Sequence, residues 1–192
     1  MGRPREFDLD AVLDAAQEAF WDHGYEGTSI QDLLEATGLQ RGSLYKAFGD
    51  KHGLYLRTLE RYQTAAVTEI TSRLDHSDGA FAGLRLWLLS AAEGCKESQR
   101  RGCFVVNSTI ELSPHDQAVA ELTETHLKHL HGVVKASVTR AQTAGDLRSD
   151  LKADEITRHL ILVAYGLAVD GRGGTSVSQR CRQADLALKL MR

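Results

Sequence analysis

Residues Thr28 to Lys51 read TSIQDLLEATGLQRGSLYKAFGDK, a pattern that predicts two short helices joined by a tight turn. Thr28 and Ser29 are suited to capping the first helix, because their hydroxyls accept hydrogen bonds from the free amide groups of a first turn. Gly38 ends that helix, since glycine tolerates the left-handed backbone found at many helix ends. Apolar residues recur at helical spacing on one side of both helices, at Ile30, Leu33, Leu34, Leu39, Leu44 and Phe48. The stretch is therefore a candidate helix-turn-helix.

The polar face of the second helix carries groups suited to DNA. Gln40 and Arg41 stand at its N-terminus, and these residue types bond adenine and guanine bidentately in the major groove. Further along are three side chains that can reach phosphates or base edges: Ser43, Tyr45 and Lys46. Asp50 is suited to capping the helix that follows, and Lys51 is the first residue of that helix. An ammonium and a helix N-terminus are therefore expected beside one phosphate.

These residues resemble the TetR-type transcriptional repressors. The likeness covers about residues 7–62 and is carried, in the family's order and spacing, by Phe20, Gly24, Tyr25, Thr28, Ser29, Ile30, Gly38, Gly42, Ser43, Leu44, Tyr45, Phe48 and Lys51. The resemblance implies DNA-facing residues at Thr28, Gln40, Arg41, Ser43, Tyr45, Lys46 and Lys51. Three departures limit what it says of the operator: Gln40 stands where serine is frequent, Ala47 where a polar residue is frequent, and Gly53 where glutamate is common.

The predicted fold is all-α. Only two prolines occur in 192 residues, and the long segments have helical periodicity. We expect a three-helix DNA-binding head over residues 1–50 and a larger helical body for effector binding and dimerisation over residues 51–192. Leu9 to Gly24 forms the first helix of that head, and a long helix from Asp50 towards Leu74 joins it to the body.

Charge is distributed locally rather than in bulk. The net charge is −3, and residues 1–61 hold seven basic against eleven acidic side chains. The segment from Gly38 to Lys51, however, is basic, and Arg3 and Arg5 precede the first helix. Arginine in such an arm can enter a narrow minor groove, although a solvated terminus explains the arm equally well. Binding is therefore expected to depend on a docked face.

The chain has no apolar leader at its N-terminus, and its longest apolar run, Leu160 to Val169, is too short to cross a membrane. Three cysteines are an odd number in a chain without an export signal. This favours a reduced, cytoplasmic compartment over a disulfide framework. No cofactor motif occurs.

The body is expected to contain four further helices. One covers Phe81 to about Glu97, and a second begins with Ser113 as cap and Pro114 at its first position and runs to about Ala144. The last two cover about Ala153 to Val169 and Ser178 to Met191, with a glycine-rich turn between them at residues 171–174. Their apolar coverage is broader than one core stripe needs, so residues 153–192 predict a homodimer, which also suits two half-sites on DNA.

The resemblance implies a small-molecule effector pocket in the body. Its expected walls are Trp87, Phe104, Leu127, Leu130 and Tyr165, and its expected polar contacts are Asn107, Glu111 and His126. Each of these residues has an alternative as ordinary core or surface. The segment from Arg100 to Asn107 is similar to one in an electrophile-responsive subgroup, whose sensing cysteine lies at Cys103. Nearby arginines favour a thiolate, but we favour the alternative that Cys103 is a small buried apolar residue.

Three other interpretations were weighed. His126, His129 and His131 share one predicted helix, but two neighbouring imidazoles need Cys103 or Glu111 to complete a metal site, so none is predicted. A hydrolase using Cys103 and a histidine lacks an oxyanion-hole signal, and no catalytic residue is predicted. A helical protein-binding adaptor is favoured only if the basic face fails to bind DNA.

Overall fold

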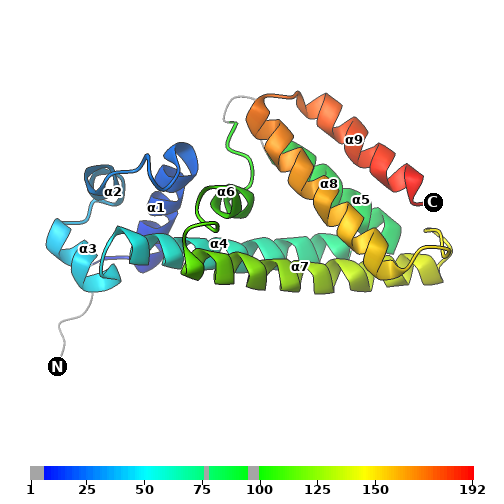
Figure 1. Cartoon of the computed structure of the whole chain (residues 1–192), viewed down its shortest axis with the longest axis horizontal. Helices are drawn as coiled ribbons and strands as arrows, with labels where there is room; N and C mark the ends of the chain where they lie inside the picture. The colour runs from blue at the N-terminus through cyan, green and yellow to red at the C-terminus, as the bar shows by residue number, and fades with distance from the viewer. Residues whose placement is uncertain (1–6, 76–77, 95–99) are drawn as a thin grey trace.

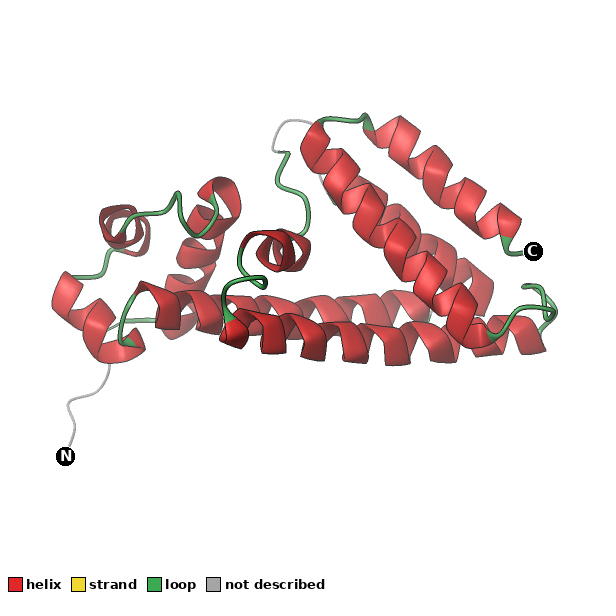
Figure 2. Cartoon of the chain, viewed as in Figure 1, coloured by secondary structure: helices red, strands yellow, loops and turns green. Residues whose placement is uncertain are grey.

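The computed structural model describes residues 7–75, 78–94 and 100–192, so Arg3 and Arg5 lie outside the described residues. Within these ranges the chain forms nine α-helices and no strand (Figure 2). The predicted all-α fold is confirmed. None of the helices in the described ranges has both the length and the apolar content of a membrane span.

The head consists of α1 (Leu9–His23), α2 (Ile30–Thr37) and α3 (Arg41–Phe48), and it lies at one end of the elongated molecule (Figure 1). Ser29 and Asp32 form a capping box at the start of α2, in which each side chain accepts from the other's backbone amide. Gly38 ends α2 with φ +67°. The turn predicted from the sequence therefore forms as expected, and it sets α3 across the end of the head.

One long helix joins the head to the body. Helix α4 (Lys51–Leu74) leaves the head with Asp50 as its N-cap and runs beside α7 (Gln117–Thr143) along the body (Figure 1). Helices α5 (Ala80–Glu93), α8 (Ala153–Gly173) and α9 (Val177–Leu190) pack together at the far end. The short α6 (Phe104–Glu111) lies between the head and these three helices.

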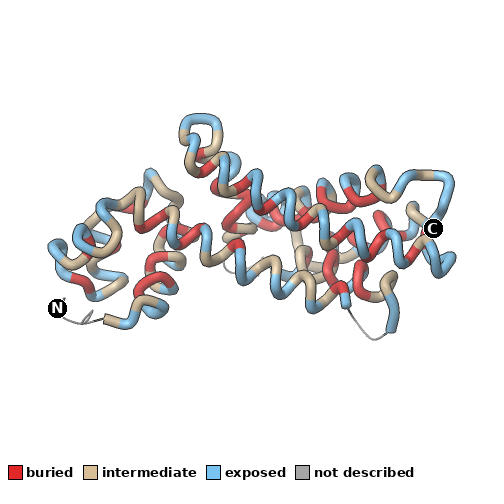
Figure 3. Tube along the Cα trace, turned by 90° about the horizontal axis from the view of Figure 1, so that it is seen from below, coloured by how far each residue is buried: buried red, intermediate tan, exposed pale blue. Residues whose placement is uncertain are grey.

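Two apolar cores hold the chain together, and buried positions recur along each helix (Figure 3). The body core is built from α4, α5, α7, α8 and α9. The head core includes Leu54, Tyr55 and Leu59 of α4, and it also takes Phe104 and Val105 from α6. One apolar core therefore contains residues from both sides of residue 50. The predicted division into two functional domains at residue 50 stays a prediction, and it does not coincide with a boundary between the two cores.

The helices differ from the prediction in three places. Helix α6 was not predicted. Helix α7 begins at Gln117, because Asp116 rather than Ser113 accepts the capping bond, from the Val119 amide at 3.1 Å. Ser113 and Pro114 instead lie in the turn after α6, where the Ser113 hydroxyl bonds that of Thr123 at 3.1 Å. Helix α8 continues through Gly171 to Gly173 and is capped by Gly174, so the glycine-rich turn is shorter than expected.

Candidate functional site

Helix α3 presents a cationic polar face to solvent. Gln40, Arg41, Tyr45 and Lys46 are exposed and Ser43 is half-buried, whereas Leu44 on the opposite side is fully buried in the head core. No acidic residue lies in the first turn of α3. Within the described residues, Arg41 and Lys46 form no salt bridge. Both cations are therefore available to an external anion such as a phosphate.

The Thr28 side chain lies inside the head. This residue has no exposed surface, and its hydroxyl donates to the Gly24 carbonyl at 2.6 Å. The side chain closes the loop between α1 and α2 from inside. Its hydroxyl is therefore engaged within the head, and a contact of Thr28 with DNA stays a prediction.

Lys51 also acts mainly inside the head. Its ammonium donates to the carbonyls of Tyr25 at 2.8 Å and Thr28 at 2.9 Å, and it lies 4.1 Å from the centre of the Tyr25 ring. A lysine ammonium has three donors. Two of the three N–H donors of Lys51 are therefore used inside the head, and one remains for the predicted contact with a phosphate.

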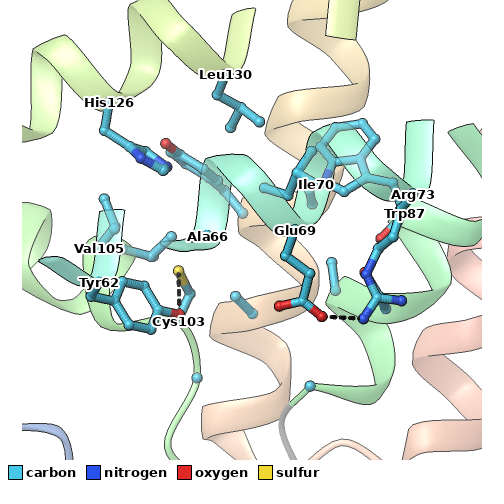
Figure 4. Close-up of a pocket in the computed structure, with 18 of the residues that line it drawn as sticks. Tyr62, Ala66, Glu69, Ile70, Arg73, Trp87, Cys103, Val105, His126 and Leu130 are labelled. Carbon is cyan, nitrogen blue, oxygen red and sulfur yellow. Dashed lines mark hydrogen bonds and ion pairs between the residues drawn. The ribbon is translucent and has the colours of Figure 1, made fainter. Parts of the chain in front are cut away.

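A cavity of about 270 Å³ lies in the body, between α4, α5, α7, α8 and the loop that precedes α6 (Figure 4). Five of the predicted pocket residues line it: Trp87, Cys103, His126, Leu130 and Tyr165. His126 reaches in from α7, and Cys103 lies beside Tyr62, whose hydroxyl is 3.8 Å from the sulfur (Figure 4). Residues from distant parts of the sequence thus line one cavity.

The other four predicted pocket residues lie elsewhere. Phe104 points into the head core, where its ring packs edge-on against Tyr55 at 5.7 Å. Asn107 donates to the Arg101 carbonyl at 2.7 Å, and Glu111 accepts from the Glu26 amide of the head at 3.0 Å. Leu127 follows His126 on α7 and is 40 % exposed, because one residue along a helix is a rotation of about 100°.

Sequence reasoning missed the residues that connect the cavity to the head. Trp21 of α1 and Tyr62 of α4 both line the cavity, and their rings meet edge-on at 5.2 Å. Tyr62 also packs edge-on against Phe104 at 5.5 Å. Both tryptophans of the chain, Trp21 and Trp87, therefore lie at the cavity. No local pattern in the sequence of α1 or α4 indicates that these two residues meet at a cavity.

Three titratable groups of the cavity wall, on His126, Cys103 and Tyr165, are held in their neutral forms. Burial lowers the pKa of His126 to about 4, with a smaller effect from His129. Burial also raises the pKa of the Cys103 thiol and raises that of Tyr165 to about 12. The expectation that neighbouring arginines favour a Cys103 thiolate is wrong, because removal from water has the larger effect.

Arg101 shows where one of those arginines is engaged. Its guanidinium bonds Glu18 at 2.5 Å and Asp22 at 2.8 Å, and both carboxylates belong to α1. Arg101 precedes Gly102 and Cys103, which both line the cavity. Arg101 therefore links the loop that lines the cavity to the first helix of the head.

The three histidines of α7 do not come together as a metal site. Among the described residues, no group of three or more His, Cys, Asp or Glu side chains is placed to hold a metal ion. His131 instead lies 3.2 Å from Asp154 of α8, which also pairs with Lys135 and Arg158.

Comparisons with known proteins agree with this architecture. The family model for bacterial regulatory proteins of the tetR family matches residues 12–58, and that for a tetracyclin repressor-like C-terminal domain matches residues 80–183. The chain is 29% identical over 191 residues to the HTH-type transcriptional repressor ComR of Escherichia coli. This alignment covers 98% of this chain and 91% of ComR. It is 33% identical over 162 residues to the uncharacterised HTH-type transcriptional regulator YezE of Bacillus subtilis, covering 83% of this chain and 84% of YezE.

A solved structure of the TetR family regulator CifR superposes along the full length of both chains. This cysteine variant of CifR, complexed with a 26bp double-strand operator DNA, has a TM-score of 0.86 and is 28% identical, with 100% of each chain covered. The exposed α3 face, the helical body and these matches lead to one conclusion: the chain belongs to the TetR family of bacterial regulatory proteins and is a helix-turn-helix, DNA-binding transcriptional regulator.

Proposed function

We propose that two copies of this chain bind an operator with two half-sites, repress transcription from it, and leave it when a small molecule occupies the cavity. The observation that carries the DNA-binding part is the exposed α3 face, on which Arg41 and Lys46 have no acidic partner among the described residues. The relatives ComR and CifR support it, since one is a repressor and the other is solved with operator DNA. A regulator of this kind acts in the cytoplasm, where bacterial DNA lies.

A homodimer is supported by the apolar surface of the last two helices. Leu162 and Val169 lie two turns apart on the same face of α8, and both are exposed. Leu186 and Leu190 of α9 are exposed as well. These four exposed apolar side chains leave an apolar stripe that a second copy would cover. Twofold symmetry then presents two α3 helices to successive major grooves.

The proposed release mechanism follows the contacts between cavity and head. A ligand that displaces Tyr62 or the wall around Cys103 also disturbs Trp21 and Phe104, which pack on Tyr62. Movement of α4 or of the Arg101 loop then changes the position of α3. The effector must bind the non-DNA-binding arrangement more tightly, because a ligand shifts an equilibrium only by its difference in affinity for the two states.

We propose no catalytic role for Cys103. A hydrolase needs a thiolate activated by a base, whereas burial raises the pKa of this thiol and its sulfur lies beside the Tyr62 hydroxyl. A protein-binding adaptor is also set aside, since it does not explain unpaired cations on a helix that follows a tight turn.

The test begins with selection of bound sequences from random double-stranded DNA. We expect an inverted repeat whose half-sites are separated by about one helical turn. On the selected duplex, Arg41→Ala should weaken binding by about 1–3 kcal/mol, or roughly 5-fold to 150-fold, measured by fluorescence anisotropy. Arg148→Ala at the far end of the body is the control and should leave the affinity unchanged. Equal binding by Arg41→Ala and the parent chain would refute DNA recognition through α3.

A further inference from the structure

The interior of the cavity has almost no formal charge. Aromatic rings form much of its wall, from Trp21, Tyr62, Trp87 and Tyr165, and aliphatic side chains form most of the rest. Of the described residues that line it, only Glu69 and Arg73 carry a formal charge at neutral pH. These two stand one turn apart on α4 and are ion-paired to each other, with 65% and 32% of their side chains exposed (Figure 4). The charged pair is therefore at the mouth of the cavity, and it is neutral as a unit.

Two residues that line the cavity, His126 and Trp21, each have a buried polar atom without a hydrogen-bond partner among the described residues. His126 is 5% exposed, and its Nδ1 is buried with no partner among the described residues. Two other polar groups of the lining are engaged: the Ser90 hydroxyl donates to the Trp87 carbonyl at 2.7 Å, and Tyr62 pairs with Cys103. A buried polar atom without a partner is costly, so His126 marks where a ligand gains a hydrogen bond. The Trp21 indole Nε1 is a second buried atom without a partner.

The state of His126 limits the ligand group that fits it. Burial keeps the ring neutral at pH 7 because its pKa is about 4. A neutral imidazole has one donor and one acceptor nitrogen. A hydroxyl both donates and accepts, so it pairs with Nδ1 whichever nitrogen carries the proton. A carboxylate or an ammonium, by contrast, would be moved from water to a wall that offers no free counter-charge.

Size gives a further limit. An apolar cavity of about 150 Å³ accepts benzene, and this one measures about 270 Å³. The space is therefore sufficient for a molecule of about two fused rings with one small substituent.

We propose that the effector is an uncharged, mainly apolar molecule of about this size, bearing a hydroxyl that pairs with His126, and that Glu69 excludes anions by occupying Arg73. This inference rests on the proposed function only in taking the cavity as the effector site. It assigns His126 and Glu69 as specificity-determining residues. It also makes covalent modification of Cys103 unnecessary for binding.

Four naphthalenes that differ in one substituent test the proposal on the full-length protein. They are 2-naphthalenemethanol, 2-methylnaphthalene, 2-naphthoate and 2-naphthylmethylammonium, each measured by equilibrium dialysis at pH 7.5. The alcohol should bind on the order of tenfold or more tighter than either ion. It should bind about fivefold tighter than the hydrocarbon, which corresponds to one net hydrogen bond.

Two variants and a matched control locate the cause. His126→Leu should bring the ratio between alcohol and hydrocarbon close to one, whereas His129→Leu, an exposed position on the same helix, should leave it unchanged. Glu69→Gln frees Arg73 and should raise the affinity for 2-naphthoate severalfold, with little change for the alcohol.

The wild-type ranking alone decides the main claim. If 2-naphthoate or the ammonium binds as tightly as the alcohol, or if none of the four probes binds, the inference is overturned. Operator binding without any probe is measured in the same preparation. A protein that binds its operator but ranks the probes differently contradicts this inference only, whereas one that does not bind DNA contradicts the proposed function.

Discussion

Lys46 and Lys51 lie five residues apart, but their ammonium groups have different surroundings. Lys46 is exposed on α3, whereas the Lys51 ammonium holds the carbonyls of Tyr25 and Thr28. Both lysines were predicted to contact DNA, because residue type and spacing do not reveal which donors are used inside the protein. The burial of Thr28 was missed for the same reason: a capping residue and a core residue look alike in a sequence.

Substitution of Lys51 by methionine separates these roles. Lys51→Met leaves two carbonyls without their charged donor, so we expect a loss of about 1–3 kcal/mol in the free energy of unfolding, measured by urea denaturation. Lys46→Met should leave stability within about 0.5 kcal/mol and weaken operator binding. Unchanged stability in Lys51→Met, with operator affinity lost, would show that the lysine is a phosphate contact instead.

His126 predicts a pH dependence of stability. Its pKa is about 4 in the folded protein and near 6.5 when unfolded. Between these values the unfolded chain binds more protons, so the stability contributed by the neutral ring is present above pH 6.5 and is lost as the pH falls towards 4. From pH 7 to pH 4 the unfolding free energy of the parent chain should therefore fall by roughly 3 kcal/mol relative to that of His126→Leu. His129→Leu should run parallel to the parent chain, and a parallel curve for His126→Leu would contradict the assignment.

Among the helices, those with apolar stripes and capping residues were predicted closely, and α6 was not. Its sequence, FVVNSTIE, contains four β-branched residues in eight, a composition that disfavours an isolated helix. The side chain of Cys103, the N-cap residue, makes no capping hydrogen bond to the first turn of α6. Packing of Phe104 and Val105 into the head core supplies what local propensity lacks, and such tertiary contacts cannot be derived from the sequence of the segment.

The cavity was predicted in part for a related reason. His126 and Leu130 are four residues apart, so helical periodicity places them on one face of α7, and both line the cavity. Trp21 lies in α1, far from the body in sequence. Its place at the cavity depends on how the head docks on α6, which periodicity does not determine.

At this scale the ion pairs of Arg101 connect two elements. A double-mutant cycle of Arg101→Met with Asp22→Asn should give a coupling energy of about 1 kcal/mol, measured by urea unfolding, because the guanidinium also bonds Glu18 and is only 19% exposed. The cycle of Arg148→Met with Asp150→Asn is the control, since that pair lies two residues apart in one loop. Coupling near zero between Arg101 and Asp22 would remove this contact from the route between cavity and head.

Across the whole molecule, α4 and α6 join the DNA-binding head to the body that contains the cavity. Its net charge of −3 is unfavourable for DNA binding in general. A single α3 face offers only Arg41 and Lys46 as free cations among the described residues, so a lone protomer is expected to bind weakly. Duplication of that face by dimer symmetry is what makes tight binding to one operator feasible.

Leu162→Lys links dimerisation to recognition. Leu162 is 68% exposed on α8, so a charge there should leave the protomer folded while preventing a second copy from covering the stripe. Light scattering should show a dimer for the parent chain and a monomer of about the chain mass of 21.1 kDa for the variant. Leu190→Lys at the end of α9 provides a second, independent variant.

Titration of the selected inverted repeat with the parent chain and with Leu162→Lys is the decisive measurement. We predict that the parent chain binds as two protomers per duplex and that the monomeric variant, still folded by circular dichroism, binds at least about 100-fold more weakly because each protomer holds one half-site. A monomeric variant that binds the same duplex as tightly as the parent chain would contradict recognition by a symmetric pair of α3 helices.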